Sequence, residues 1–173
     1  MTISMYQASV PVFVHQLKAL SACLDKAEAM CKAKQIEETV VTGMRLAPDM
    51  LPMSRQVQIA CDFAKGASAR LAGVDIPAYD DTEKTFGELR ARIAKTIAYV
   101  QTLTAKQIDG SEEREMQNLK IGGNPVKIKG QPYLVHFAMP NFYFHVTTAY
   151  AVLRHNGVDL GKRDFMGPVP GLS

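Results

Sequence analysis

The sequence has no tryptophan, only three cysteines, and no hydrophobic run long enough to cross a bilayer. A membrane-spanning helix needs about 20 consecutive apolar residues, so no membrane span is expected. The N-terminal segment lacks the basic start, apolar stretch and small-residue cleavage site of a signal peptide. Cys23, Cys31 and Cys61 form no CxxC pair, which predicts buried free thiols in a reducing compartment. The expected location is cytoplasmic.

A strong excess of one charge sign is also absent. The 20 basic and 17 acidic residues leave a formal net charge of +3, and the basic residues are spread along the chain. Without a clustered basic patch, neither nucleic acid nor a membrane surface is an expected partner. The length of 173 residues predicts a single domain over 1–173, with a tail from about 158 to 173.

The common catalytic and metal-binding patterns are missing as well. No two of the four histidines have the i,i+3 or i,i+4 spacing that places two imidazoles on one helix face. There is no G-x-S-x-G motif, and the glycines of "IGGNP" lack the lysine and helix that follow a phosphate-binding loop. These absences remove the usual sequence evidence for an enzyme.

What the chain does have is four segments with apolar residues at steps of three and four, typical of amphipathic helices. These segments cover about 4–34, 50–71, 86–100 and 132–156. In the first segment, Pro11 marks either the start of regular helix or a kink. Asp49 is a suitable N-cap for the second segment. Thr85 and Glu88 have the spacing of a capping box at the start of the third.

Between the third and fourth helical segments, "NLKIGGNPVKIKG" alternates apolar and polar residues around Gly122-Gly123-Asn124. This pattern predicts a β-hairpin. We therefore predict an all-α fold, an up-and-down type four-helix bundle with a short β-hairpin before the last helix. Gly66 inside the second helix costs about 1 kcal/mol relative to alanine, which suggests a close helix crossing as compensation. The small-residue stripe and long amphipathic faces also favour a homodimer.

The last helical segment contains "MPNFYFHVTTAYAVLRHNG", in which His145 faces the apolar side and Asn141 lies one turn earlier. Three interpretations of His145 remain open at this stage. It is a metal ligand, an acid-base or ligand-binding residue without metal, or a core histidine bonded through one ring nitrogen. Asn141 is either its partner or an N-cap just after Pro140.

The order of these parts, with "LRHNG" closing the last helix, resembles the DinB/YfiT-like superfamily of four-helix-bundle proteins. The phrases "SMYQASVPVFVHQL", "RLAPDMLPMSRQVQIACDFAKG" and "LGKRDF" look like a bacterial branch known only as a domain of unknown function. The superfamily implies a divalent metal, often zinc or nickel. One histidine of the second helix and an H-x-x-x-H pair of the fourth would hold it. Its characterised members include S-transferases and an isomerase that use low-molecular-weight thiols.

Carried over onto this chain, the resemblance places His145 on the second histidine of the pair and Asn141 on the first. The second helix contains no histidine, and Gln58 and Asp62 are the polar residues nearest the expected place. Because amides are poor ligands for zinc or nickel, we expect a degenerate site and no metal cofactor, with His145 as the ligand if one binds.

Two functional hypotheses follow, and whether the protein is an enzyme stays open. The first is a non-catalytic module for small-ligand binding or dimerisation. Its expected ligand-binding residues are Asn141, His145, Gln58 and Asp62. The alternative is a metal- or thiol-dependent enzyme, similar to an S-transferase, with His145 as the candidate catalytic residue.

Overall fold

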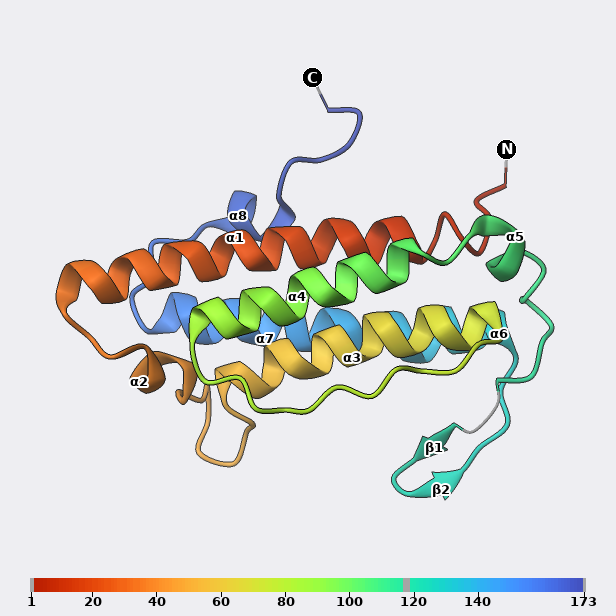
Figure 1. The fold of residues 1–173 in the computed structure, drawn as a ribbon, viewed down its shortest axis with the longest axis horizontal. Helices are drawn as coiled ribbons and strands as arrows, with labels where there is room; N and C mark the ends of the chain where they lie inside the picture. Colours follow the sequence, from red (N-terminus) through yellow and green to blue (C-terminus); the bar gives the residue numbers. More distant parts are fainter. Residues whose placement is uncertain (1, 117–118, 173) are drawn as a thin grey trace.

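Four long helices form the body of the molecule, a computed structural model that describes residues 2–116 and 119–172. The long helices are α1 (Val10–Lys34), α3 (Met53–Ala72), α4 (Phe86–Gln101) and α7 (Met139–His155) (Figure 1). The shorter elements are α2 (Glu38–Thr42), α5 (Ala105–Ile108), β1 (Lys120–Ile121), β2 (Asn124–Pro125), α6 (Gly130–Tyr133), the π-helix η1 (Leu134–Ala138) and α8 (Lys162–Met166). The architecture is the predicted all-α four-helix bundle.

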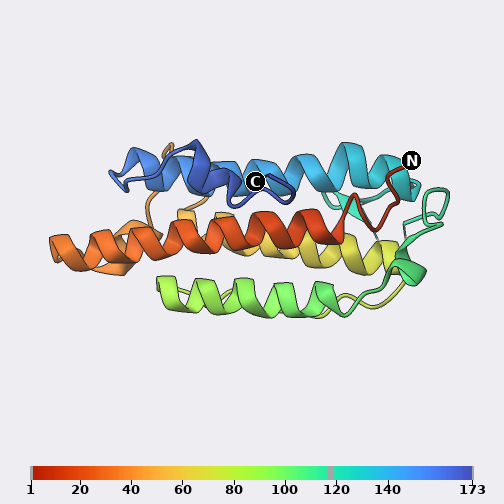
Figure 2. The ribbon, with the colours of Figure 1, turned by 90° about the horizontal axis from the view of Figure 1, so that it is seen from above.

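The helices follow one another around the bundle in the order α1, α4, α3, α7, and each contacts its two neighbours (Figures 1 and 2). α3 and α4 run in the same direction, and α1 and α7 run together in the opposite one. The relative directions of the four long helices therefore differ from the up-and-down type that we expected from the sequence.

The parallel arrangement of α3 and α4 requires a link that returns along the full length of a helix. α4 has 16 residues and is about 24 Å long at 1.5 Å per residue. Residues 73–85 span this distance as an extended segment without regular secondary structure, lying along α3 (Figure 1). An extended chain covers about 3.3 Å per residue, so the link is long enough. It leaves one side of α3 covered by loop rather than by helix.

Neighbouring residues explain where α4 and α1 begin, whereas α3 begins without a side-chain cap. Thr85 and Glu88 form the predicted capping box of α4: the Glu88 amide donates to Thr85 Oγ1 at 3.2 Å, and the Thr85 amide donates to Glu88 Oε2 at 2.9 Å. Pro11 lies in the first turn of α1, so the regular helix begins there rather than kinking. Asp49 is not the cap of α3, because Pro52 precedes that helix and no side chain caps it.

The last helical stretch is continuous from α6 through η1 into α7. The wider π turn comes immediately before Pro140, which has no backbone N–H to donate. The Asn141 side chain donates through Nδ2 to the Phe137 carbonyl at 2.7 Å. Asn141 is therefore inside a helix and is not an N-cap.

The segment before this helix contains a short antiparallel pairing of β1 with β2. Ile121 lies opposite Asn124 in the register of β1 and β2, around the Gly122-Gly123 turn. Each strand is only two residues long, which is too short to confirm the predicted hairpin. Asn118, where the predicted hairpin begins, lies outside the described residues.

The core lies between the four helices, where the rings of Phe13 and Phe142 meet edge to face with centroids 4.9 Å apart. All three cysteines are free and buried, as predicted. Burial raises the pKa of Cys23 to about 11 and that of Cys61 to about 12, so both thiols stay protonated at neutral pH.

The C-terminal tail folds back onto α1. Gln16 donates to the Phe165 carbonyl at 2.7 Å, and Asp164 forms an ion pair with Lys26 at 2.8 Å. α8 is therefore a fixed part of the bundle surface (Figure 2). Among the helices of the described ranges, none combines the length and the apolar character that crossing a membrane demands.

Candidate functional site

His145 of α7 is bonded to a glutamine on α3. Its Nδ1 lies 2.8 Å from Gln56 Oε1. The amide nitrogen of Gln56 donates to the Leu51 carbonyl at 3.0 Å, which orients the amide so that its oxygen faces the ring. Nδ1 is therefore the ring nitrogen that carries the proton and donates to Gln56. In the neutral ring the lone pair is on Nε2.

Aromatic rings pack on both sides of this imidazole. Phe63 stacks on His145, with centroids 5.9 Å apart and an angle of 18° between the planes. Phe144 meets it edge-on at 5.2 Å. Burial lowers the pKa of His145, and the positive charge of Arg55 lowers it further. The imidazole is therefore neutral at pH 7, half-buried and held in place.

Asn141 shares this face of α7 with His145 but is bonded elsewhere. Its amide nitrogen donates to the Phe137 carbonyl one turn back, beside the π-helical segment. This bond supports the backbone next to Pro140 and turns the amide nitrogen away from the ring of His145. The structure thus places the two predicted residues on one face without a bond between them.

Gln58 and Asp62 do not face His145, contrary to our expectation from the sequence. Two residues correspond to about 200° around a helix, so Gln58 points away from the side occupied by Gln56. Gln58 donates to Glu83 Oε2 at 2.8 Å and accepts from Arg55 Nη1 at 2.7 Å. Gln56 is the residue that sequence analysis missed. Both glutamines flank Val57 of the apolar stripe, and the sequence does not say which flank faces α7.

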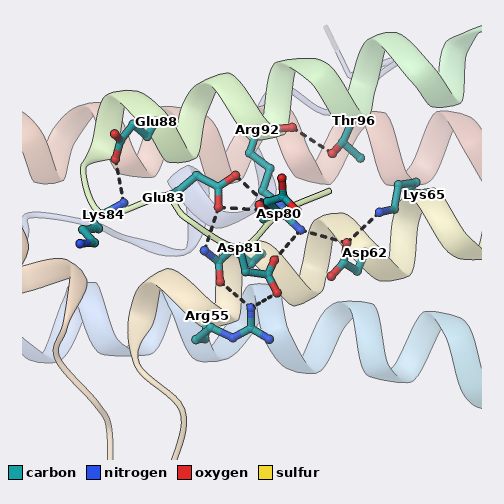
Figure 3. Close-up of polar contacts among 11 residues, drawn as sticks. Arg55, Asp62, Lys65, Asp80, Asp81, Glu83, Lys84, Glu88, Arg92 and Thr96 are labelled. Atoms are coloured by element: carbon teal, nitrogen blue, oxygen red, sulfur yellow. Dashed lines mark hydrogen bonds and ion pairs between the residues drawn. The ribbon is translucent and has the colours of Figure 1, made fainter. Parts of the chain in front are cut away.

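Asp62 belongs instead to a charged network around Arg92 of α4 (Figure 3). The Arg92 side chain is only 1% exposed. Its Nη2 lies 3.0 Å from Asp62 Oδ1 and 2.9 Å from Asp81 Oδ1, and its Nη1 lies 3.2 Å from Glu83 Oε1. Burial by itself lowers the pKa of Arg92, but the bond to Glu83 and the nearby carboxylates raise it overall.

This network holds the 73–85 link against the bundle. Arg55 forms an ion pair with Asp81, and Arg92 also donates to the Asp80 carbonyl at 2.9 Å (Figure 3). Two ammonium groups contact the ring of Tyr79, with Lys65 Nζ 4.0 Å and Lys95 Nζ 4.1 Å from its centroid. These cation–π contacts add to the ion pairs. The link is therefore fixed from both α3 and α4.

A cleft of about 460 Å³ lies between α3, the link, the residues around β1, and the α6–η1 turn. Its apolar wall contains Phe63, Phe137 and Tyr133, in which neighbouring rings lie 5.9 and 5.8 Å apart. Phe63 therefore contacts His145 on one side and the cleft on the other. Of the predicted site residues, Asp62 lines the cleft, whereas Asn141, His145 and Gln58 are not part of its wall.

The residues around His145 do not fit the three-histidine metal centre that the resemblance implies. There is one imidazole, its Nδ1 is bonded to Gln56, and the amide nitrogen of Asn141 is bonded to the Phe137 carbonyl. Within residues 2–116 and 119–172, no three His, Cys, Asp or Glu side chains are grouped so that they could hold a metal ion. Neutral amide oxygens are weak donors for zinc or nickel.

Comparisons with known proteins show the family to which the chain belongs. Residues 5–166 match the model of the family described as "Domain of unknown function (DUF1993)". A crystal structure of a DinB family member protein from Shewanella denitrificans is 39% identical, with a TM-score of 0.89. The alignment covers 97% of this chain and 94% of that one. No curated protein matches the chain. The chain therefore belongs to the DUF1993 family of DinB-like proteins, a family of unknown function.

Proposed function

We propose that this protein is a non-catalytic, small-ligand-binding DinB-like protein whose ligand binds in the cleft beside α3. The observation that carries the proposal is the cleft itself, about 460 Å³ with aromatic rings on one wall and polar groups converging from the others. Ligand pockets in proteins commonly have volumes of 300–1,000 Å³ and a largely apolar lining with a few placed polar groups.

The surroundings of His145 support a structural role for that residue within the proposal. An imidazole that donates to Gln56 and stacks on Phe63 has its orientation determined by packing. The same Phe63 ring forms part of the cleft wall. His145 would then position the aromatic wall of the cleft rather than act on a substrate.

A cleft-blocking variant tests the proposal. Ala78 is exposed and lines the cleft from the link, so Ala78→Trp would fill the space without altering the core. Ala29→Trp, on the exposed side of α1, is the matched control. We expect a screen of small aromatic compounds, read by thermal shift and NMR titration, to find ligands that Ala78→Trp loses and Ala29→Trp keeps. Ligands that bind both variants equally, or no ligands at all, would contradict the proposal.

An enzyme that uses His145 is the second candidate, and one observation favours it. Gln56 accepts from Nδ1, so the lone pair of Nε2 is available to take a proton or one metal ion. Metal analysis of protein purified without an affinity tag, repeated on His145→Ala, separates the candidates. Stoichiometric zinc or nickel that the variant loses would support the enzyme, and metal-free protein with intact ligand binding would support the binding module.

We also propose that the chain forms a homodimer. Several large apolar side chains are exposed on η1 and α7, including Val135 at 50% and Phe144 at 56%. Aromatic side chains such as that of Phe144 are enriched at protein interfaces. Light scattering coupled to size exclusion tests the proposal, and Phe144→Glu is expected to shift a dimer toward monomer. A monomeric mass for the unmodified protein at micromolar concentration would refute it.

A further inference from the structure

The inference drawn here rests on the proposed ligand-binding function and concerns the chemical class of the ligand. We infer that the cleft beside α3 selects a small organic anion, with a flat apolar body on the aromatic wall and a carboxylate on Arg70.

Three cationic side chains and one carboxylate line this cleft. The cations are Lys65, Arg70 and Lys120, and the carboxylate is Asp62. Asp62 already forms ion pairs with Lys65 at 3.1 Å and with Arg92 at 3.0 Å, so its negative charge is balanced by these two cations. The excess positive charge in the cleft is therefore on Arg70 and Lys120.

Arg70 of α3 is half-buried and lacks the carboxylate partners that Lys65 and Arg92 have. Across the part of the chain that the structure describes, it forms no ion pair, and its Nε is buried without a hydrogen-bond partner. Among the described residues its one hydrogen bond is a long one, from Nη1 to the Tyr133 hydroxyl at 3.4 Å. Arg92 on the next helix is more deeply buried and has three carboxylates. A guanidinium that lacks such partners is a ready receptor for an anion.

Arg70 lies at the end of α3, but the last carbonyls of this helix do not take the place of the missing carboxylate partner. The last carbonyls of a helix attract cations, but Arg70 reaches backward, over Gly66 one turn earlier. A Cβ on Gly66 would lie 2.9 Å from Arg70 Nη1. The exposed end of the helix is used by Arg114, which donates to the Leu71 carbonyl at 2.6 Å. Gly66 thus accommodates the guanidinium at the cleft, not the close helix crossing that we expected from the sequence.

The apolar wall defines the other half of the ligand. Phe63, Phe137 and Tyr133 form a row along the cleft that ends at the guanidinium, since the Tyr133 hydroxyl accepts from Arg70 Nη1 at 3.4 Å. A flat ring system would lie against this row with its carboxylate at Arg70. Lys120, exposed on β1, would add attraction at the mouth of the cleft.

Three probes with one ring system test the inference on the intact chain: 2-naphthoate, 2-naphthamide and 2-naphthylmethylammonium. We expect saturable binding of 2-naphthoate by calorimetry or NMR, at least about tenfold tighter than binding of the amide or the ammonium compound. Arg70→Gln should remove this preference, Arg70→Lys should keep part of it, and Arg154→Gln, an exposed arginine on α7, should leave it unchanged. A tenfold ratio corresponds to about 1.4 kcal/mol.

The outcomes distinguish this inference from the function on which it rests. Equal binding of all three probes, with Ala78→Trp blocking each of them, would overturn the anion preference and leave the ligand-binding cleft in place. No saturable binding of 2-naphthoate, or binding that Arg70→Gln does not weaken, would also overturn the inference. A wider screen with no ligand sensitive to Ala78→Trp would overturn the proposed function itself.

Discussion

The two sides of α3 carry polar residues of very different character. The side facing α7 has a neutral bond between Gln56 and His145, packed by aromatic rings. The side facing α4 and the 73–85 link has Asp62 and its network around Arg92 (Figure 3). The first side joins two helices that pack directly, and the second joins helices to a segment that has no regular structure of its own.

This difference shows where a buried charge is useful in the bundle. Two helices with complementary apolar faces need only have their few buried polar groups satisfied, and one amide–imidazole bond does this. An extended link contributes little apolar surface, so several ion pairs and cation–π contacts fix its position instead. The charged side is therefore expected to be the more sensitive to single substitutions.

The largest expected effect is from Arg92→Met. Removing the guanidinium leaves Asp62, Asp81 and Glu83 close together without a central cation, which should cost about 3 kcal/mol in the free energy of unfolding. This value is near the low end for buried pairs, because Asp62 and Asp81 are 39% and 36% exposed. Urea denaturation measures the loss.

Arg90→Met is the matched control for that variant. Arg90 lies on the same helix and pairs with Asp25 and Glu28, but its side chain is 24% exposed, against 1% for Arg92. Surface ion pairs contribute little, so the loss should be several-fold smaller than for Arg92→Met. Equal losses for the two variants would show that burial of the charge is not what makes the α4 side sensitive.

A double-mutant cycle sharpens the comparison on the α7 side. His145→Ala and Gln56→Ala should show a coupling of about 1 kcal/mol, typical of one neutral hydrogen bond. The cycle of His145→Ala with Gln58→Ala should show coupling near zero, because Gln58 bonds to Glu83 and Arg55. A coupling through Gln58 as large as that through Gln56 would refute the assignment of the two glutamines.

The two sides should also differ in their response to mild acid. The pKa of His145 is lowered in the folded protein, so below about pH 6.5 the unfolded chain binds the proton first. The stability from the neutral imidazole is complete above that pH and is lost as pH falls through the folded pKa. His145→Gln should therefore flatten the fall in unfolding free energy between pH 7 and pH 5. If the unfolding free energy of His145→Gln falls with pH as steeply as that of the unmodified protein, a group other than His145 causes the fall.

Gly66→Ala should have the smallest effect on stability. Alanine gains about 1 kcal/mol of helix propensity, and displacement of the Arg70 guanidinium offsets part of this gain. The net change in unfolding free energy should be below 1 kcal/mol, and binding of 2-naphthoate should weaken because Arg70 has moved. A strongly destabilised variant would mean that the glycine serves backbone packing.

Much of the fold could be predicted from local patterns in the sequence. The apolar stripes identify all four long helices, and the Thr85–Glu88 capping box identifies the start of α4 to the residue, because both depend on neighbours within a few positions. The direction of α4 could not be predicted in this way. A long link permits either direction, and the choice depends on contacts such as that of Asp81 with Arg92, which form only in the folded bundle.

The candidate site was predictable only in part for a similar reason. The apolar face of the last helix places His145 inside the bundle, but Gln56 and Gln58 flank the same stripe of α3. Which of them meets His145 depends on how α3 is rotated between α7 and α4, and that rotation is a property of packing. The proposed role of Arg70 could not be predicted from the sequence either, since an arginine in the last turn of a helix is expected to bond the last carbonyls.

The parallel course of α3 and α4 has a consequence for how this family can diversify. One rim of the cleft beside α3 is an extended segment that takes no part in helix–helix packing. Replacing Ile76, Pro77 or Ala78 would therefore reshape the opening while the scaffold stays intact. Relatives with the same scaffold could thus differ widely in what they accept, with the variation concentrated in this short stretch.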